Sequence, residues 1–172
     1  GDDALLRFVI SLFEDHDIAV IGAHHLLPEL TADQGVLSGI IPDHAYADIN
    51  RADHIMSTLS SLDIGQGIVV ENGLTLGIET LQGTDALLNF VAQTDDHLRH
   101  LNRGILVKRP KLDQDLRVDM PTIGPDTIQA VARAGLSGIV ISPNQVILVD
   151  RLAIIQLAKD LGLFVAALEI RT

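Results

Sequence analysis

Charged side chains of both signs crowd one stretch of the sequence, KRPKLDQDLRVDMPTIGPDT, at residues 108–127. Its cations, Lys108, Arg109, Lys111 and Arg117, suit phosphate oxygens, and arginine can bind these in a bidentate manner. Its carboxylates suit a hard divalent cation, which takes oxygen ligands from one or two carboxylates and from phosphate. The stretch therefore predicts a site where a metal ion and a phosphate-bearing substrate meet. The alternative is a solvated loop with weak surface ion pairs.

The spacing of the acids favours the site if the stretch is extended, because side chains of an extended segment alternate between two faces. We then expect one polar face, made of Asp113, Asp115, Arg117 and Asp119. The opposite face, directed toward the core, is expected to carry Gln114, Leu116, Val118 and Met120.

The stretch ends at a predicted helix start. Pro125 suits the first helical position, and Gly124 or Thr122 could supply the turn before it. A helix N-terminus has free N–H groups and a partial positive charge, so it is a natural place for a phosphate.

Two other polar segments adjoin predicted strands. Gly83, Thr84 and Asp85 follow an apolar strand and open a helix, where α/β sheets place ligand-binding loops; alternatively, Asp85 only caps the helix. Glu79, at the end of that strand, needs a partner if it is buried. The segment 63–66 precedes the previous strand, and its residue types alone favour a simple turn.

Alternating helices and apolar strands must position these residues. We expect helices over 3–15, 43–59, 84–93, 126–134 and 150–161. We expect strands at 18–22, 105–107 and 163–170, and β-hairpins over 67–79, around Asn72-Gly73, and over 138–149. The segment 23–42 is expected to be irregular. This order predicts an α/β three-layer sandwich, with a mixed, mainly parallel sheet and helices on both faces.

The composition fits one domain over residues 1–172, with an aliphatic core. Of the 172 residues 47% are hydrophobic but only 3% aromatic, which is typical of buried sheets covered by helices. A net charge of −11 argues against nucleic acid as a partner. No cysteine is present for a disulfide or a thiolate metal site, and no apolar run is long enough to span a bilayer.

Four segments, taken together, resemble one family in their order along the chain and in nearly all of their residues. The family is the UDP-2,3-diacylglucosamine pyrophosphatases of lipid A biosynthesis, the LpxI type, of which the chain resembles the C-terminal domain. The segments are GDDALLR, DIGQGIVVENG, IETLQGTDALL and the charged stretch KRPKLDQDLRVDMPTIGPDT.

The resemblance implies hydrolysis of a UDP-diacylglucosamine to UMP and 2,3-diacylglucosamine 1-phosphate (lipid X), with Mg²⁺ or another divalent cation such as Mn²⁺. It implies a cytoplasmic enzyme held at the inner membrane surface through its lipid substrate. It also implies an N-terminal Rossmann-like domain as a partner, which this chain lacks, and a homodimer is a further expectation. The acyl chains need an apolar groove, for which residues 26–30 and 36–41 are candidates.

The resemblance also assigns roles by position. Asp119 becomes the first candidate for the essential carboxylate and Asp115 the second, with Arg117 beside them. Asp119, Asp115, Asp85 and Glu79 are the expected metal ligands. Substrate contacts are expected from Lys108, Lys111, Gln114, Thr122, Gly124, Gly83, Thr84, Asp63 and Gln66. The match of DIGQ to the family replaces the simple-turn interpretation of residues 63–66.

The chain departs from the family pattern in two places besides the missing domain. Gln82 stands where a glutamate is usual, and Asn89 and Phe90 stand where an arginine is usual. Two other functions therefore stay open: a UDP-sugar or lipid-binding domain without activity, and a phosphohydrolase for another nucleotide diphosphate.

Overall fold

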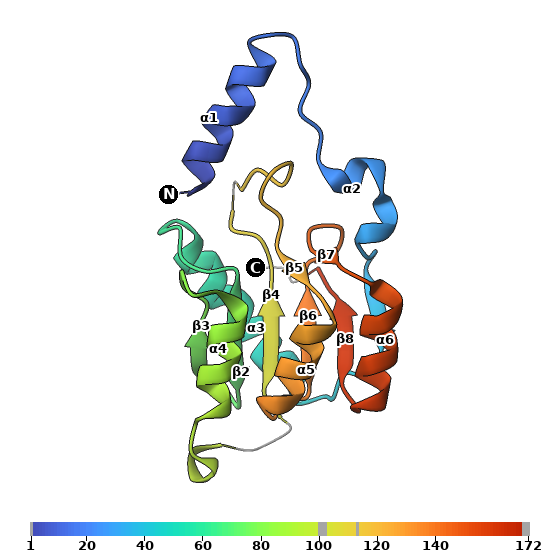
Figure 1. Cartoon of the computed structure of the whole chain (residues 1–172). Coiled ribbons are helices and arrows are strands. Elements are labelled where there is room, and N and C mark those ends of the chain that lie inside the picture. Colours follow the sequence, from blue (N-terminus) through green and yellow to red (C-terminus); the bar gives the residue numbers. More distant parts are fainter. Residues whose placement is uncertain (1, 100–102, 113, 170–172) are drawn as a thin grey trace.

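Six strands form a mixed central sheet in the order β1-β8-β6-β4-β2-β3 (Figure 1). The computed structural model describes residues 2–99, 103–112 and 114–169. The strands of this sheet are β1 (Gly35–Ser38), β2 (Gly67–Glu71), β3 (Leu74–Ile78), β4 (Ile105–Lys108), β6 (Gly138–Ile141) and β8 (Phe164–Ala167). The central strands β4, β6 and β8 are parallel, whereas β1 and the β2–β3 hairpin pair in antiparallel fashion at the two sides.

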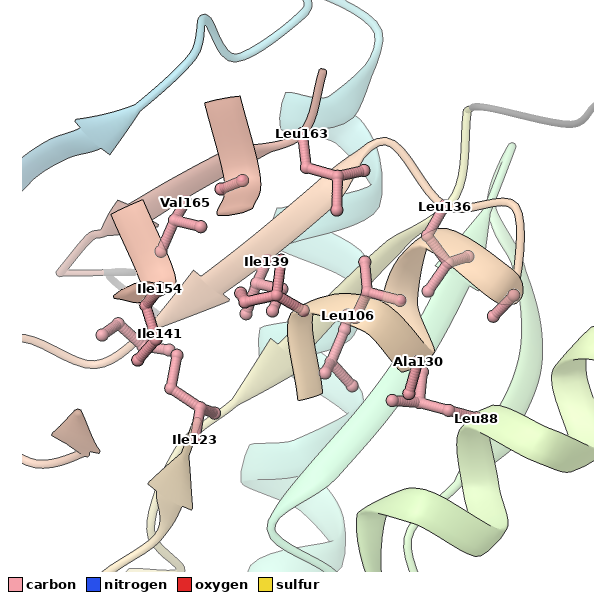
Figure 2. Packing of buried hydrophobic residues seen from close by; sticks show 14 of the residues in the cluster. Leu88, Leu106, Ile123, Ala130, Leu136, Ile139, Ile141, Ile154, Leu163 and Val165 are labelled. Atoms are coloured by element: carbon pink, nitrogen blue, oxygen red, sulfur yellow. The ribbon is translucent and has the colours of Figure 1, made fainter. Parts of the chain in front are cut away.

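Helices cover both faces of the sheet, which confirms the three-layer prediction. The helix α3 (Ala45–Ser60) covers one face, and α4 (Gly83–Ala92), α5 (Pro125–Arg133) and α6 (Arg151–Asp160) cover the other (Figure 1). The central strands are buried on both faces, so their side chains alternate between two cores. Ile105 and Val107 pack on the α3 side, whereas Leu106 packs on the other side with Leu88 and Ile139 (Figure 2).

The predicted hairpin at residues 67–79 is confirmed as β2 and β3. Asn72 and Gly73 form its turn with positive φ angles of 49° and 74°, as a tight hairpin turn requires. The buried carboxylate of Asp48, in α3, accepts hydrogen bonds from both turn amides, at 2.9 Å from Asn72 N and 2.6 Å from Gly73 N. This contact fixes the hairpin against α3.

The second predicted hairpin, at 138–149, is wrong. Both sides of β6 are already paired, with β4 and β8, so no edge is left for the segment that follows it. That segment forms β7 (Ile147–Leu148), which pairs in parallel with β5 (Thr122–Ile123) in a separate two-stranded sheet. The C-terminal part of the charged stretch is thereby tied to the segment that follows β6.

The prediction of a buried strand at residues 18–22 is also wrong, because this part of the chain lies outside the three layers. Ile18 and Ile21 are each 53% exposed and join no sheet. They connect α1 (Asp2–Glu14) to α2 (Ala23–Leu26) and a short 3-10 turn, η1 (Pro28–Leu30). The prediction that residues 23–42 are irregular is wrong, because this segment contains α2, η1 and β1, and β1 pairs with β8.

A second short 3-10 turn, η2 (Asp96–Leu98), precedes β4. Among the described residues, no helix is long and apolar enough to cross a membrane.

Candidate active site

The polar segments singled out above meet at one edge of the sheet. The strands β4, β6 and β8 are parallel, and β3 runs in the same direction because β2 is antiparallel to both of its neighbours. The carboxyl ends of these four strands and the start of β2 therefore share an edge, where α/β sheets commonly bind ligands. We call it the carboxyl edge.

The charged stretch leaves β4 at this edge as a turn. The amides of Val118 and Asp119 donate to Asp115 O at 3.3 and 3.2 Å, so the chain reverses between these residues. The predicted extended conformation with one acidic face is wrong, because these local hydrogen bonds replace pairing with another strand. Asp113, which was expected on that face, lies outside the described residues.

The turn directs Asp119 toward two glutamine amides. Asp119 Oδ2 accepts from Gln114 Nε2 at 2.6 Å and from Gln66 Nε2 at 3.4 Å. Gln114 is itself held, because its Oε1 accepts from Lys111 N at 2.9 Å and its Nε2 also donates to Asp119 O at 3.0 Å. Gln66 and Gln114, expected as substrate contacts, thus orient the carboxylate expected to be essential.

Asp115 is engaged differently, by a guanidinium. Arg117 donates to it from Nε at 2.9 Å and from Nη2 at 2.7 Å, and the third nitrogen, Nη1, donates to Glu14 of α1 at 2.7 Å. The hydrogen bonds from Arg117 lower the pKa of Asp115 to about 2, and the two carboxylates raise the pKa of Arg117. In this arrangement Arg117 joins α1 to the turn.

Lys108 and Glu79 form a pair at the ends of β4 and β3. Lys108, 4% exposed, donates from Nζ to Glu79 Oε2 at 3.1 Å and also to the hydroxyl of Thr84. The Thr84 hydroxyl in turn donates to Glu79 Oε2 at 2.9 Å. The partner that Glu79 required is therefore Lys108, and the pair ties the start of α4 to β4.

Lys111 pairs with Asp63 at the surface. The hydrogen bond and positive charge of Lys111 lower the pKa of Asp63, whose side chain is 53% exposed. Solvent screens such a pair strongly, so it costs little to open when a substrate binds.

The remaining predicted site residues lie along the same edge without converging on Asp119. Gly83 begins α4, and Asp85 is exposed in its first turn, one of the positions where an acid favours a helix N-terminus. Asp85 is not the cap residue of α4, because that position is taken by Gln82. Thr122 is exposed in β5, and Gly124 precedes α5, as predicted, with its N–H donated to Thr127 Oγ1 at 3.2 Å.

A cavity of about 600 Å³ is lined in part by the charged stretch and shares Lys111 and Gln114 with this cluster. Lys111, Gln114 and Leu116 form one wall, and residues that follow β6 and β8, such as Ser142 and Leu168, form another. Asp53 and Ser57 of α3 and Arg109 also line it.

Arg109 is the cation built into this cavity. Its guanidinium forms an ion pair with the buried Asp53 and donates from Nη2 to Ser57 Oγ at 3.0 Å. Burial lowers the pKa of Arg109. Sequence reasoning missed Asp53 and Ser57, although an acid between Ala52 and Met56, on the buried side of a helix, is a signal for a buried partner.

A divalent cation would find one suitable carboxylate here. Within the described ranges no three His, Asp or Glu side chains gather as a metal site, so the four expected ligands do not form a cage. Asp115 and Glu79 are paired with cations, whereas Asp119 accepts only from neutral amides in the contacts given above. A Mg²⁺ ion fits Asp119 because it commonly uses one or two carboxylates and takes its other ligands from substrate phosphates and water.

Comparison with known proteins decides the family. The model of the LpxI C-terminal domain matches residues 33–166. The chain belongs to the LpxI C-terminal domain family. Its sequence is also 45% identical over 174 residues to the UDP-2,3-diacylglucosamine pyrophosphatase LpxI of Caulobacter vibrioides, covering 98% of this chain and 62% of that relative.

The LpxI match places the candidate site within the family domain. Its range includes Gln66, Glu79 and the whole charged stretch, but not α1 or α2. The chain spans about three fifths of the length of the LpxI relative from Caulobacter.

Proposed function

We propose that the protein hydrolyses the diphosphate of UDP-2,3-diacylglucosamine to UMP and 2,3-diacylglucosamine 1-phosphate, a step in lipid A biosynthesis. The observation that carries the proposal is the 45% identity to a relative named for this substrate, extending through the residues that gather around Asp119. Hydrolysis adds water across one phosphorus–oxygen bond of the diphosphate, so atoms balance with no further reactant.

Asp119 is the proposed catalytic carboxylate. Held by Gln66 and Gln114, it would orient the attacking water and accept its proton as the new phosphorus–oxygen bond forms. The bridging oxygen leaves with the other phosphate. Both glutamines lie on the carboxyl edge, so Asp119 is fixed before substrate arrives, which lowers the cost of positioning the reactants.

The cations around the cavity would hold the diphosphate. Arg109 and Lys111 both line the cavity, and Lys111 would leave its exposed partner Asp63 to bind phosphate oxygens. Arg117 would have to release Glu14 before it could contact phosphate oxygens. Asp119 and the diphosphate together would hold the divalent cation, Mg²⁺ or Mn²⁺, which supplies charge neutralisation and a water of lowered pKa.

The exposed face of α1 supports the proposal of a partner domain. Leu5, Phe8, Leu12 and Phe13 recur at helical spacing and are 47–64% exposed, a pattern that indicates a covered face. We propose that the N-terminal Rossmann-like domain implied by the family packs here, with a second copy of the chain as the alternative. Attachment to the inner membrane from the cytoplasm would come from the lipid substrate.

Product analysis tests this function. Incubation of the protein with UDP-2,3-diacylglucosamine and Mg²⁺ should release UMP and the diacylglucosamine 1-phosphate in equal amounts, and a chelator should stop the release. Binding of the substrate without release of UMP would favour the non-catalytic domain instead. Equal hydrolysis of UDP-sugars that lack acyl chains would favour a phosphohydrolase of different specificity.

A further inference from the structure

A second, apolar hollow of about 250 Å³ lies between β3 and α4. Its walls are formed by Gly77 and Ile78 of β3 and by Ala86, Leu87 and Phe90 of α4. Among the residues that line it none is charged, and the polar ones, Thr80 and Gln82, come from the loop between β3 and α4. An occupant of this hollow must therefore be largely apolar.

Leu87 packs closely on β3 at this hollow, while other apolar side chains beside it are exposed. A side chain at Gly77 would bring its Cβ within 2.5 Å of Leu87 Cδ1, so glycine lets Leu87 lie directly on the strand. Phe90 lines the hollow but is 65% exposed, and Leu81, in the same loop as Thr80, is 93% exposed. Large apolar side chains left this open bury additional surface when a ligand covers them.

The position of the hollow connects it to the candidate active site. Its loop runs directly into Gly83 and Thr84, and the Thr84 hydroxyl contacts the Lys108–Glu79 pair. Only β2 separates β3 from β4, so the hollow begins about 10 Å from the carboxyl end of β4, which is two strand spacings. A substrate held at Asp119 by its phosphates could reach it with a flexible apolar arm.

We propose that this hollow binds one acyl chain of the diacylglucosamine substrate, with Phe90 and Leu87 as the residues that determine chain-length preference. The inference rests on the proposed function, because the acyl chains belong to that substrate. The segments 26–30 and 36–41, expected from the sequence to form the groove, expose Leu26 and Ile40 but line neither cavity described above.

A matched pair of substitutions on α4 tests the assignment. Ala86→Leu places a larger side chain inside the hollow, whereas Ala92→Leu makes the same change at an exposed position in the last turn of the helix, outside it. The dissociation constant is measured for UDP-glucosamine bearing two butanoyl or two decanoyl chains, below their micelle-forming concentrations. Circular dichroism checks that each variant is folded.

The parent and Ala92→Leu should bind the decanoyl compound more tightly, by about fourfold for each additional methylene that is buried. Ala86→Leu should lose most of this preference while its affinity for the butanoyl compound stays the same, and Phe90→Ser should show the same loss. An unchanged preference in Ala86→Leu, or none in the parent, would overturn the assignment. A preference for the decanoyl compound without any release of UMP would refute the proposed reaction. The assignment of the hollow to an acyl chain would still stand.

Discussion

At the residue level, most carboxylates of the site are paired with cations, whereas one carboxylate is held by amides. Lys108–Glu79, Arg117–Asp115 and Lys111–Asp63 each join opposite charges. Asp119 is held instead by Gln66 and Gln114. This difference is the structural reason to assign the chemistry to Asp119, because its negative charge stays available to a cation or to a water proton.

Residue types and spacing could predict which residues lie at this edge, but not how they pair. The partner of Arg117 in α1, Glu14, is separated from it by 103 positions, and the partner of Arg109 is Asp53 on α3. Only the packing of whole elements brings these side chains together. The alternation expected between 113 and 119 failed for a related reason, because local turn hydrogen bonds took the place of a strand partner.

The Asp115–Arg117 pair predicts a pH dependence of stability. The folded-state pKa of Asp115, about 2, lies below its ordinary value of 3.8, so the pair stabilises the fold above pH 3.8 and loses its effect as the pH falls through about 2. The Asp115→Asn variant should lower the free energy of unfolding by roughly 1 kcal/mol at pH 6, since Arg117 is partly exposed and solvent screens the pair.

Urea denaturation at pH 6 and near pH 2 measures this effect. The difference between parent and variant should shrink at the lower pH. The exposed Asp33 provides a control, because Asp33→Asn should change stability little at either pH. A deficit of Asp115→Asn that is equal at both pH values would contradict the argument.

At the scale of elements, the continuous apolar runs of β4, β6 and β8 and the Asn72-Gly73 turn could be predicted because their signals are local. The pairing of the strands could not be predicted in this way. Residues 18–22 and 147–148 have the composition of strands of the central sheet, yet the first form no strand and the second pair with β5. Whether an apolar segment joins the sheet depends on which strand edges are free. The local sequence carries no information about these edges.

The edge opposite the site is held together by a buried ion pair. Arg99, 8% exposed, donates from Nη2 to Glu71 Oε2 at the end of β2 at 2.8 Å, and from Nη1 to Ala134 O after α5 at 2.7 Å. The Arg99→Met variant should lower the free energy of unfolding by about 3–5 kcal/mol, because it removes the cation paired with a buried carboxylate.

Chemical denaturation of Arg99→Met beside Arg51→Met checks this prediction. Arg51 is exposed on α3, so its replacement should cost less than about 1 kcal/mol. Similar losses in the two variants would show that the buried pair contributes no more than a surface arginine.

At the scale of the whole molecule, the net charge of −11 opposes adsorption to anionic lipid. If attachment to the membrane depends on the substrate, the protein should sediment with phosphatidylglycerol vesicles only when UDP-2,3-diacylglucosamine is included in them. Vesicles with an equal amount of phosphatidylcholine in its place are the control. Equal sedimentation with both kinds of vesicle would point to a lipid-binding surface independent of the active site.

The most direct test of the account is the turnover of the protein beside its Asp119→Ala variant, measured as UMP release from UDP-2,3-diacylglucosamine with Mg²⁺. The turnover number of Asp119→Ala should fall by about 100-fold or more, the usual size of an acid–base contribution. The dissociation constant for the product, 2,3-diacylglucosamine 1-phosphate, should stay within about threefold of the parent value, since the cations and the apolar hollow remain. A loss of about 1.4 kcal/mol of binding free energy would already raise this constant tenfold. Unchanged turnover in Asp119→Ala would contradict the central claim and place the catalytic carboxylate elsewhere on the carboxyl edge.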